Sequence, residues 1–169
     1  LKKPRAATIE EVSTVHTINQ IEEVAEIAKA GGGYLDPDTH VSPDSYEAAL
    51  YASGALLTAI DLVMDKKTDN AFCLVRPPGH HSTPAKAMGF CLFNNVAIAA
   101  KYIQSEYNLD RVAIIDWDVH HGNGTQDAFY DDPSVLFFSM HKYPFYPGTG
   151  AKEETGEGSG SGFTINVPL

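Results

Sequence analysis

The sequence predicts a parallel, doubly wound α/β fold, and two patterns along the chain indicate it. Segments whose apolar residues recur at helical spacing alternate with short, continuous apolar runs, which are typical of strands covered on both faces. Two of these runs are followed at once by segments rich in histidine and aspartate. Because open α/β sheets bind ligands beyond the carboxyl ends of their strands, a functional site is expected there.

Three helices are expected from the apolar spacing. They cover residues 8–30, 42–66 and 93–107. The glycines at 31–33 end the first helix, and residues 34–41 have the composition of a loop. The second helix has a clear start, because Ser42 is a capping residue and Pro43 suits the first helical position.

Four strands are expected from the continuous apolar runs. They cover residues 71–75, 112–115, 135–139 and 163–167. Cys73 is expected to be a buried residue of the first strand. The glycine- and acid-rich stretch 148–162 has the composition of a linker, but strand-like sequence follows it directly, so a long surface loop is expected. Strands that alternate with helices favour a parallel sheet.

Length and composition favour one ordinary globular domain. The chain has 169 residues, 43% hydrophobic and 20% charged, which excludes disordered and collagen-like classes. No apolar run approaches the roughly 20 residues of a membrane span. The net charge of −10 disfavours nucleic acid and favours cationic ligands, although solubility alone also explains such a charge. Two cysteines cannot form a disulfide framework, which favours a reducing, intracellular setting. The sequence has no basic cluster of the nuclear type, which favours a bacterial, cytoplasmic protein.

The segment after the second strand has the donors of a metal site. Asp116, Asp118 and His120 alternate, so in extended backbone their side chains share one face. Strand spacing puts Asp118 and His120 about 6–7 Å apart at Cα, so both can reach one ion. A nitrogen and a carboxylate ligand favour zinc or iron(II) over calcium or magnesium. Asp116 lies one step deeper and is better placed to hold a partner.

The Asp-x-Asp-x-His spacing alone has a common structural explanation, since aspartates at strand ends often cap helices. A second segment changes the balance. His80 and His81 follow the first expected strand and supply the acid–base groups that a metal hydrolase needs. A neighbouring aspartate or asparagine orients such histidines by accepting a hydrogen bond from the far ring nitrogen. Together the two segments predict a metal-dependent hydrolytic site.

Four blocks of the sequence resemble the signature segments of the zinc-dependent histone deacetylase family. They are Arg76–His81, Met88–Cys91, Asp116–Gly124 and Tyr146–Gly150. The third block is most similar to class II members and to bacterial deacetylase-like amidohydrolases. The resemblance implies a three-layer, mostly parallel sheet of the arginase/deacetylase type in a single domain over residues 1–169. It also implies that this domain is incomplete at both ends, with a third zinc ligand and a transition-state tyrosine downstream of Leu169.

The resemblance assigns a role to each polar residue of these blocks. The zinc ligands are Asp118 and His120, the catalytic histidines are His80 and the general base and acid His81, and the residues that orient them are Asp116 and Asn123. Class I members carry an aspartate where Asn123 stands. His81 is therefore expected to be less basic than a histidine backed by a carboxylate.

Four further residues match the parts of the family that bind substrate. Phe90 and Tyr146 match the two aromatic walls of the narrow tunnel that holds the acyl-lysine stem, and Gly89 offers a carbonyl. Many relatives have phenylalanine at the position of Tyr146, so the polarity of the tunnel differs here. Asp38 falls near the rim aspartate that holds the backbone of the substrate.

The resemblance also implies a structural potassium site. Its ligands would be the side chains of Asp116 and Ser139 and the main-chain carbonyls of Asp118, His120 and Met140. Such a site explains a serine at the end of an apolar strand. A plain strand-end hydroxyl explains that serine equally well.

The implied function is a zinc-dependent deacetylase that hydrolyses an acetylated peptide, protein or polyamine to a free amine and acetate. Metal-activated water would attack the acetyl carbonyl, with His81 as the proton carrier. Two alternatives remain open. One is a catalytically inactive deacetylase-like binding module, and the other is a binuclear-metal ureohydrolase of the same fold. Neither a nucleic-acid nor a membrane partner is expected.

The other aromatic and histidine residues that we considered have structural explanations. His16 is expected at a helix end, and His40 and His141 are expected in loops, with His141 near the rim of the site. Trp117 is expected to pack in the core on the opposite face of the sheet.

Overall fold

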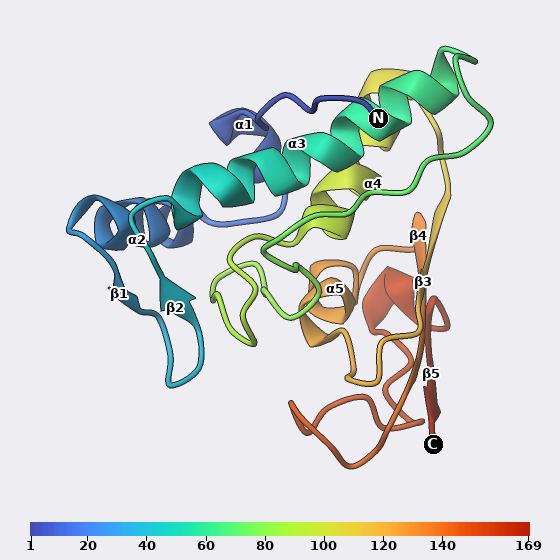
Figure 1. Ribbon diagram of the computed structural model, residues 1–169. Coiled ribbons are helices and arrows are strands. Elements are labelled where there is room, and N and C mark those ends of the chain that lie inside the picture. Colours follow the sequence, from blue (N-terminus) through green and yellow to red (C-terminus); the bar gives the residue numbers. More distant parts are fainter.

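The computed structural model describes residues 1–169 and places a parallel sheet beside a cluster of helices (Figure 1). The helices are α1 (Ile9–Val12), α2 (Ile18–Lys29), α3 (Ser45–Met64), α4 (Asn95–Tyr107) and α5 (Asn123–Ala128), with a 3₁₀ turn η1 (Gly158–Gly160). The strands are β1 (Gly33–Tyr34), β2 (His40–Val41), β3 (Val112–Asp116), β4 (Val135–His141) and β5 (Thr164–Pro168). Two of the three expected helices and three of the four expected strands are thereby confirmed.

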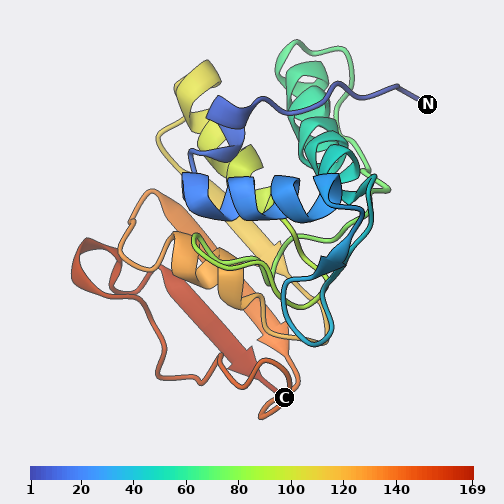
Figure 2. The same ribbon diagram turned by 90° about the vertical axis from the view of Figure 1, so that its left-hand side faces the viewer.

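The sheet has the order β3-β4-β5, and all its strands are parallel. Figure 2 shows α5 in front of the sheet, on the face that α4 also covers. Ile114 and Phe137 are buried on this face. In the register of the sheet Asp116 lies beside Ser139, and Ser139 lies beside Asn166. A row of polar residues therefore crosses the carboxyl end of the sheet.

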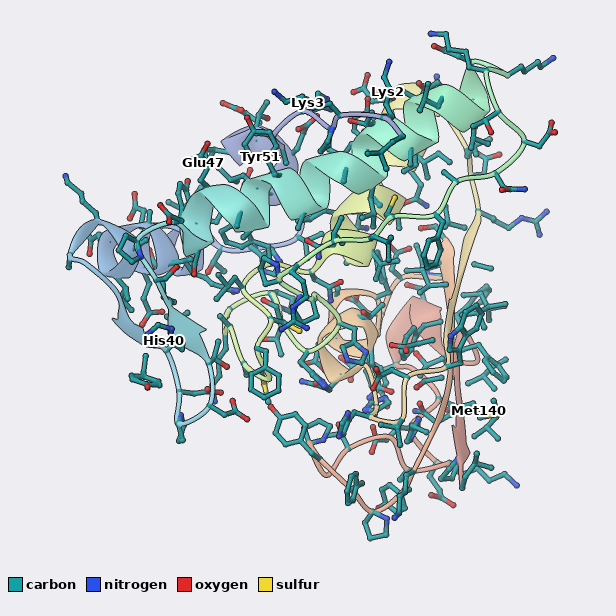
Figure 3. The ribbon with its side chains drawn as sticks, viewed as in Figure 1. Lys2, Lys3, His40, Glu47, Tyr51 and Met140 are labelled. Carbon is teal, nitrogen blue, oxygen red and sulfur yellow. The ribbon has the colours of Figure 1, made fainter.

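The opposite face of the sheet carries exposed apolar side chains. Ile115 is 62% exposed, and Met140 points away from the helices (Figure 3). Trp117, which the sequence places in the core on this face, is 78% exposed. That prediction is wrong for the described chain, because no element of residues 1–169 covers this face.

The main core lies between the helices. Leu57 of α3, Val24 of α2 and Phe93 are all fully buried there. By length and composition alone, α3 is apolar enough to cross a membrane, with a mean hydropathy of 1.4. One side of α3 packs against α4 and buries Leu57, and 28% of the apolar stretch is buried.

The first expected helix, 8–30, is two helices in the structure. Thr8 starts α1 with a capping box to Glu11, and Thr17 caps α2 by accepting a hydrogen bond from the amide of Gln20. Thr8 and Thr17, nine positions apart, each begin a separate helix. The spacing of the apolar residues does not reveal the break between the two helices. His16 lies in the break and is 2% exposed, so it is buried and not a solvated helix end.

Residues 34–41 form a short antiparallel hairpin, where the composition predicts a loop. Tyr34 of β1 pairs with His40 of β2, and the Asp36 carboxylate accepts hydrogen bonds from the amides of the turn. His141 is also in a strand, as the last residue of β4, and is 1% exposed. The loop assignments of both histidines are therefore wrong.

Residues 71–75, expected to form a strand, have no strand partner. Phe72 and Leu74 are 86% and 85% exposed, and Cys73 is half-buried. A strand requires a neighbouring backbone for its ladder, and none of the strands in residues 1–169 pairs with this segment. Both Cys73 and Cys91 are free thiols.

Truncation of the central aromatic residue tests the helical core. Phe93 is fully buried and meets Tyr46 edge to face, with ring centroids 6.1 Å apart. Phe93→Ala should lower the free energy of unfolding of the full-length protein by about 3–5 kcal/mol, because it leaves a cavity. Urea unfolding measures this loss. Glu47→Ala, on the outer side of α3 (Figure 3), should change it by less than about 0.5 kcal/mol. Equal losses in both variants would contradict the assigned core.

Candidate active site

The two segments rich in histidine and aspartate meet beyond the carboxyl end of β3. The Nδ1 atom of His80 lies 2.8 Å from the Asp116 Oδ2 atom, and the Nδ1 atom of His81 lies 2.9 Å from the Asn123 Oδ1 atom. The amide of Gly124 also donates to the carbonyl of His80, at 2.9 Å. These contacts join the loop after residue 75 to the segment that begins at Asp116.

The segment that carries the expected metal ligands is held by its own carboxylates. Oδ1 of Asp116 accepts from the amide of Asp118 at 3.1 Å, and Oδ1 of Asp118 accepts from the amide of His120 at 2.8 Å. The extended backbone assumed for residues 116–120 is therefore wrong beyond Asp116, where β3 ends. Two successive Asx turns, and not strand alternation, bring the side chains of Asp118 and His120 to the same place.

The donors at this place fit a zinc ion. The Nδ1 atom of His120 and the Oδ1 atom of Asp118 are 3.2 Å apart. Tetrahedral zinc with bonds of about 2.0–2.1 Å would hold neighbouring ligand atoms about 3.3 Å apart. No third histidine, cysteine, aspartate or glutamate of residues 1–169 joins the pair. Catalytic zinc sites usually have three protein ligands, so this chain offers part of such a set.

The imidazole of His81 is held in its neutral form. Burial, with help from the neighbouring His80, lowers the pKa of His81 to about 4, against the opposing effect of the hydrogen bond that His81 makes to Asn123. The Asn123 amide is oriented by its Nδ2 atom, which donates to the carbonyl of His81 and to the sulfur of Met88. Its Oδ1 atom must therefore accept the Nδ1–H of His81. The remaining ring nitrogen, Nε2, keeps its lone pair.

Aromatic side chains stand around the two histidines. The ring of Tyr146 meets His81 edge-on at 5.0 Å and His120 edge-on at 6.0 Å between centroids. Phe145, which the sequence analysis did not single out, stacks on His120 at 5.6 Å. In the sequence, only its position next to Tyr146 indicates that Phe145 lies at the site.

The other predicted substrate residues lie on the side of the β1–β2 hairpin. Gly89 contacts His81, since a Cβ added there would lie 2.6 Å from the His81 ring. Phe90 is 57% exposed, and its amide donates to the hydroxyl of Thr39. Asp38 lines a cavity of about 480 Å³ together with Phe90. Asp38 therefore lies at the outer side of the site, with no contact to the histidine pair.

Sequence analysis missed several residues that hold the histidine loop. Gln20 donates to the hydroxyl of Ser82 at 2.8 Å, and Asn94 donates to the carbonyl of the same residue at 3.2 Å. Gln20 and Asn94 are buried in the structure. In the sequence they are only polar residues on or beside predicted helices, and this feature does not indicate that they hold the histidine loop. Burial raises the pKa of the nearby Cys91 thiol to about 12, so Cys91 is a protonated thiol that packs beneath His81.

Two of the predicted potassium ligands, Asp116 and Ser139, lie on neighbouring strands. Ser139 of β4 is the register partner of Asp116 and is fully buried. Its hydroxyl lies 2.8 Å from the Nδ1 atom of His141, whose Nε2–H donates to the carbonyl of Gly150. The hydroxyl proton of Ser139 therefore points to His141, and its oxygen lone pairs stay free to accept a cation or a donor.

Comparison with known proteins now gives the family. The histone deacetylase domain matches the chain over residues 1–169. The chain belongs to the histone deacetylase family. The crystal structure titled HDA15 HD domain superimposes on 99% of this chain and 48% of its own, with a TM-score of 0.96 and 41% identity. The predicted arginase/deacetylase-type α/β fold is thereby confirmed.

Two curated relatives in this family are similar in sequence. A probable deacetylase of Archaeoglobus fulgidus is 44% identical over the whole chain and over 46% of its own length. The polyamine deacetylase HDAC10 of Rattus norvegicus is 52% identical over 75% of the chain and 22% of its own length. The chain therefore spans half or less of the length of these histone deacetylase relatives.

Replacement of the orienting amide tests the electrostatics of His81. In Asn123→Asp a carboxylate would face the Nδ1–H of His81 at the present 2.9 Å. An anion there favours the imidazolium form, so the pKa of His81 should rise by about 1–3 units. Ring NMR signals of the metal-free protein, followed against pH, measure this rise. An unmoved His81 titration would show that Asn123 does not control this ring.

Proposed function

We propose that this chain forms part of the active site of a zinc-dependent deacetylase. The reaction would be hydrolysis of an acetylated amine to a free amine and acetate. One observation carries the proposal: a neutral histidine, oriented by an amide, lies beside an adjacent aspartate–histidine pair with zinc-ligand spacing. The ring centroids of His81 and His120 are 5.9 Å apart, so proton transfer and metal binding would share one small space.

Asp118 and His120 would hold the zinc ion, and the third ligand would come from outside residues 1–169. Bound zinc would polarise the acetyl carbonyl and lower the pKa of a water molecule toward about 7. His81 would accept the proton of the attacking water at Nε2 and then give a proton to the amine as the C–N bond breaks. The Asp116 carboxylate would stabilise positive charge on His80, 2.8 Å away.

The substrate class follows from the walls of the site. Tyr146 and Phe90 would hold the apolar stem of an acetylated lysine or of an acetylated polyamine. The net charge of −10 favours substrates with further positive charges, whether basic peptides or polyamines. The similarity to a polyamine deacetylase supports the second type of substrate, and membership of the histone deacetylase family supports the first.

We also propose a structural potassium ion behind the zinc ligands. The free lone pairs of Ser139 and the carboxylate of Asp116, on neighbouring strands, support it. The main-chain carbonyls of Asp118, His120 and Met140 would complete its ligands. Free thiols at both cysteines also fit a reducing intracellular compartment.

The alternatives fit the structure less well. A ureohydrolase would need donors for two metal ions, and residues 1–169 bring together no group of three or more histidine, cysteine, aspartate or glutamate residues that could hold even one. An inactive binding module would not need a histidine pair with both rings oriented by side-chain hydrogen bonds, as His80 and His81 are.

Removal of the proposed general base, His81, should greatly reduce turnover but should leave the metal content unchanged. His81→Ala in the full-length protein should reduce kcat on an acetyl-lysine peptide by about 10²–10⁴-fold, the usual contribution of a positioned acid–base group. Acetate release measures turnover. Glu47→Ala, on the outer side of α3, should retain activity. An inactive parent protein would support the binding-module alternative.

Metal counting tests the ligand assignment. The full-length protein should carry one zinc ion per chain by elemental mass spectrometry, and His120→Ala should lose most of it, because one of the predicted protein ligands is removed. Two manganese ions per chain would indicate the ureohydrolase alternative. Full zinc content in the variant would show that His120 is not a ligand.

A further inference from the structure

The loop that follows β4 carries Tyr146 and is anchored at two points. At its start, the amide of Lys142 donates to the carbonyl of Val119 at 2.9 Å. At its end, a network of buried and half-buried polar groups holds Gly150 and Ala151. Tyr146 lies between these anchors and contacts the catalytic histidine, so both anchors determine where its ring stands.

The second anchor is the carboxylate of Glu154. It accepts the amide of Gly150 at 3.0 Å, the amide of Ala151 at 2.9 Å and the Nε2–H of Gln126 at 2.6 Å. Burial alone would raise the pKa of Glu154, but the hydrogen bonds from Gln126, Ala151 and Gly150 outweigh burial and lower this pKa. Glu154 is therefore an anion that draws the end of the loop onto α5.

Gln126 of α5 connects the carboxylate of Glu154 to a second histidine, His121. Its Nε2 atom faces the carboxylate of Glu154, so its Oε1 atom must accept. That oxygen lies 2.8 Å from the Nδ2 atom of Asn166 and 3.1 Å from the Nε2 atom of His121. The Nδ1 atom of His121 then accepts the hydroxyl of Thr149 at 2.8 Å. His121 directly follows the proposed ligand His120, so this network links the loop to the ligand segment.

The end of the loop packs closely against His141. Gly150 has a φ of +91°, and a Cβ added there would lie 2.3 Å from the Nε2 atom of His141. Between Gly150 and Tyr146 the chain turns tightly, with the amide of Gly148 donating to the carbonyl of Phe145. A displacement of Gly150 would therefore pass to Tyr146 within four residues.

We propose that Glu154 is a positioning residue for the reaction, acting by holding Tyr146 against His81. This inference rests on the proposed function, since it takes Tyr146 as a wall of the acyl-chain tunnel. Glu154 touches neither the histidine pair nor the proposed zinc ligands, and it acts only through the loop. Its role is to keep the tunnel narrow enough to hold an extended acetylated side chain.

Hydrogen exchange tests the anchor independently of any activity. In the full-length protein, Glu154→Ala should raise the rate of amide exchange across residues 143–151 at least several-fold and leave α3 and α4 unchanged. Glu153→Ala is the matched control, because Glu153 is an exposed glutamate of the same loop, and its exchange should equal that of the parent. Unchanged exchange in Glu154→Ala, or a rise throughout the protein, would overturn the proposal.

An exchange of the two partners tests the hydrogen bond itself. Glu154→Gln sets two amide donors against each other, and Gln126→Glu sets two carboxylates against each other, so each single variant should loosen residues 143–151. In the double variant Gln126→Glu/Glu154→Gln, every donor regains an acceptor, and exchange should return toward the parent rate. A double variant as loose as the singles would contradict a specific anchor.

Kinetics test the link to Tyr146. Glu154→Ala should raise KM for an acetyl-lysine peptide about ten-fold, a change equivalent to the loss of one charge-assisted hydrogen bond, with unchanged zinc content. In a Tyr146→Ala background the same change should alter KM less than about two-fold. Equal effects in both backgrounds would overturn the role in positioning Tyr146. An inactive parent would contradict the proposed function, whereas the exchange experiments would still decide whether Glu154 anchors the loop.

Discussion

The arrangement of the site depends on one carboxylate, that of Asp116 at the end of β3. Its Oδ2 atom binds His80, and its Oδ1 atom accepts the amide of Asp118. The first contact draws in the loop that carries His80 and His81, and the second starts the turn that brings Asp118 to His120. Because Asp116 ends a strand within a parallel sheet, its position is fixed by the backbone ladder with β4. A rigid element therefore holds both halves of the site in place.

Much of this site could be predicted because sheet topology brings strand ends together. The convergence of His81, Asp118 and His120 was expected from where the apolar runs end, and the structure brings these residues together. The route was partly wrong, since side-chain hydrogen bonds within residues 116–120, and not strand alternation, create the proximity. The apolar pattern of 71–75 predicts a strand, but a strand also needs a partner, which the pattern cannot show.

The second polar network could not be predicted for a different reason. Gln126 and Glu154 are 28 residues apart, and Gln126 and Asn166 are 40 apart, so no local spacing joins them. Only the pairing of β4 with β5 and the placement of α5 over the sheet bring the three together. The composition of residues 148–162 is that of a flexible linker, although a long surface loop was expected there. In the structure, the carboxylate of Glu154 fixes part of this loop by accepting hydrogen bonds from Gln126, Gly150 and Ala151. Buried hydrogen bonds make this stretch an anchored loop and not a flexible linker, and the amino-acid composition does not reveal such bonds.

The hydrogen-bond networks around His81 and around His121 are built from the same kinds of group, but one leaves a ring nitrogen free and the other uses both ring nitrogens. Burial lowers the pKa of both His81 and His121 to about 4, and each ring donates one N–H to a neutral amide, that of Asn123 or Gln126. A carboxylate in place of either amide would favour the charged ring. The rings differ in the nitrogen that donates, Nδ1 in His81 and Nε2 in His121, and in what the other nitrogen meets. The hydroxyl of Thr149 fills that of His121, which makes this ring a structural support. The second nitrogen of His81 has no hydrogen-bond partner within residues 1–169, so its lone pair is free to accept a proton.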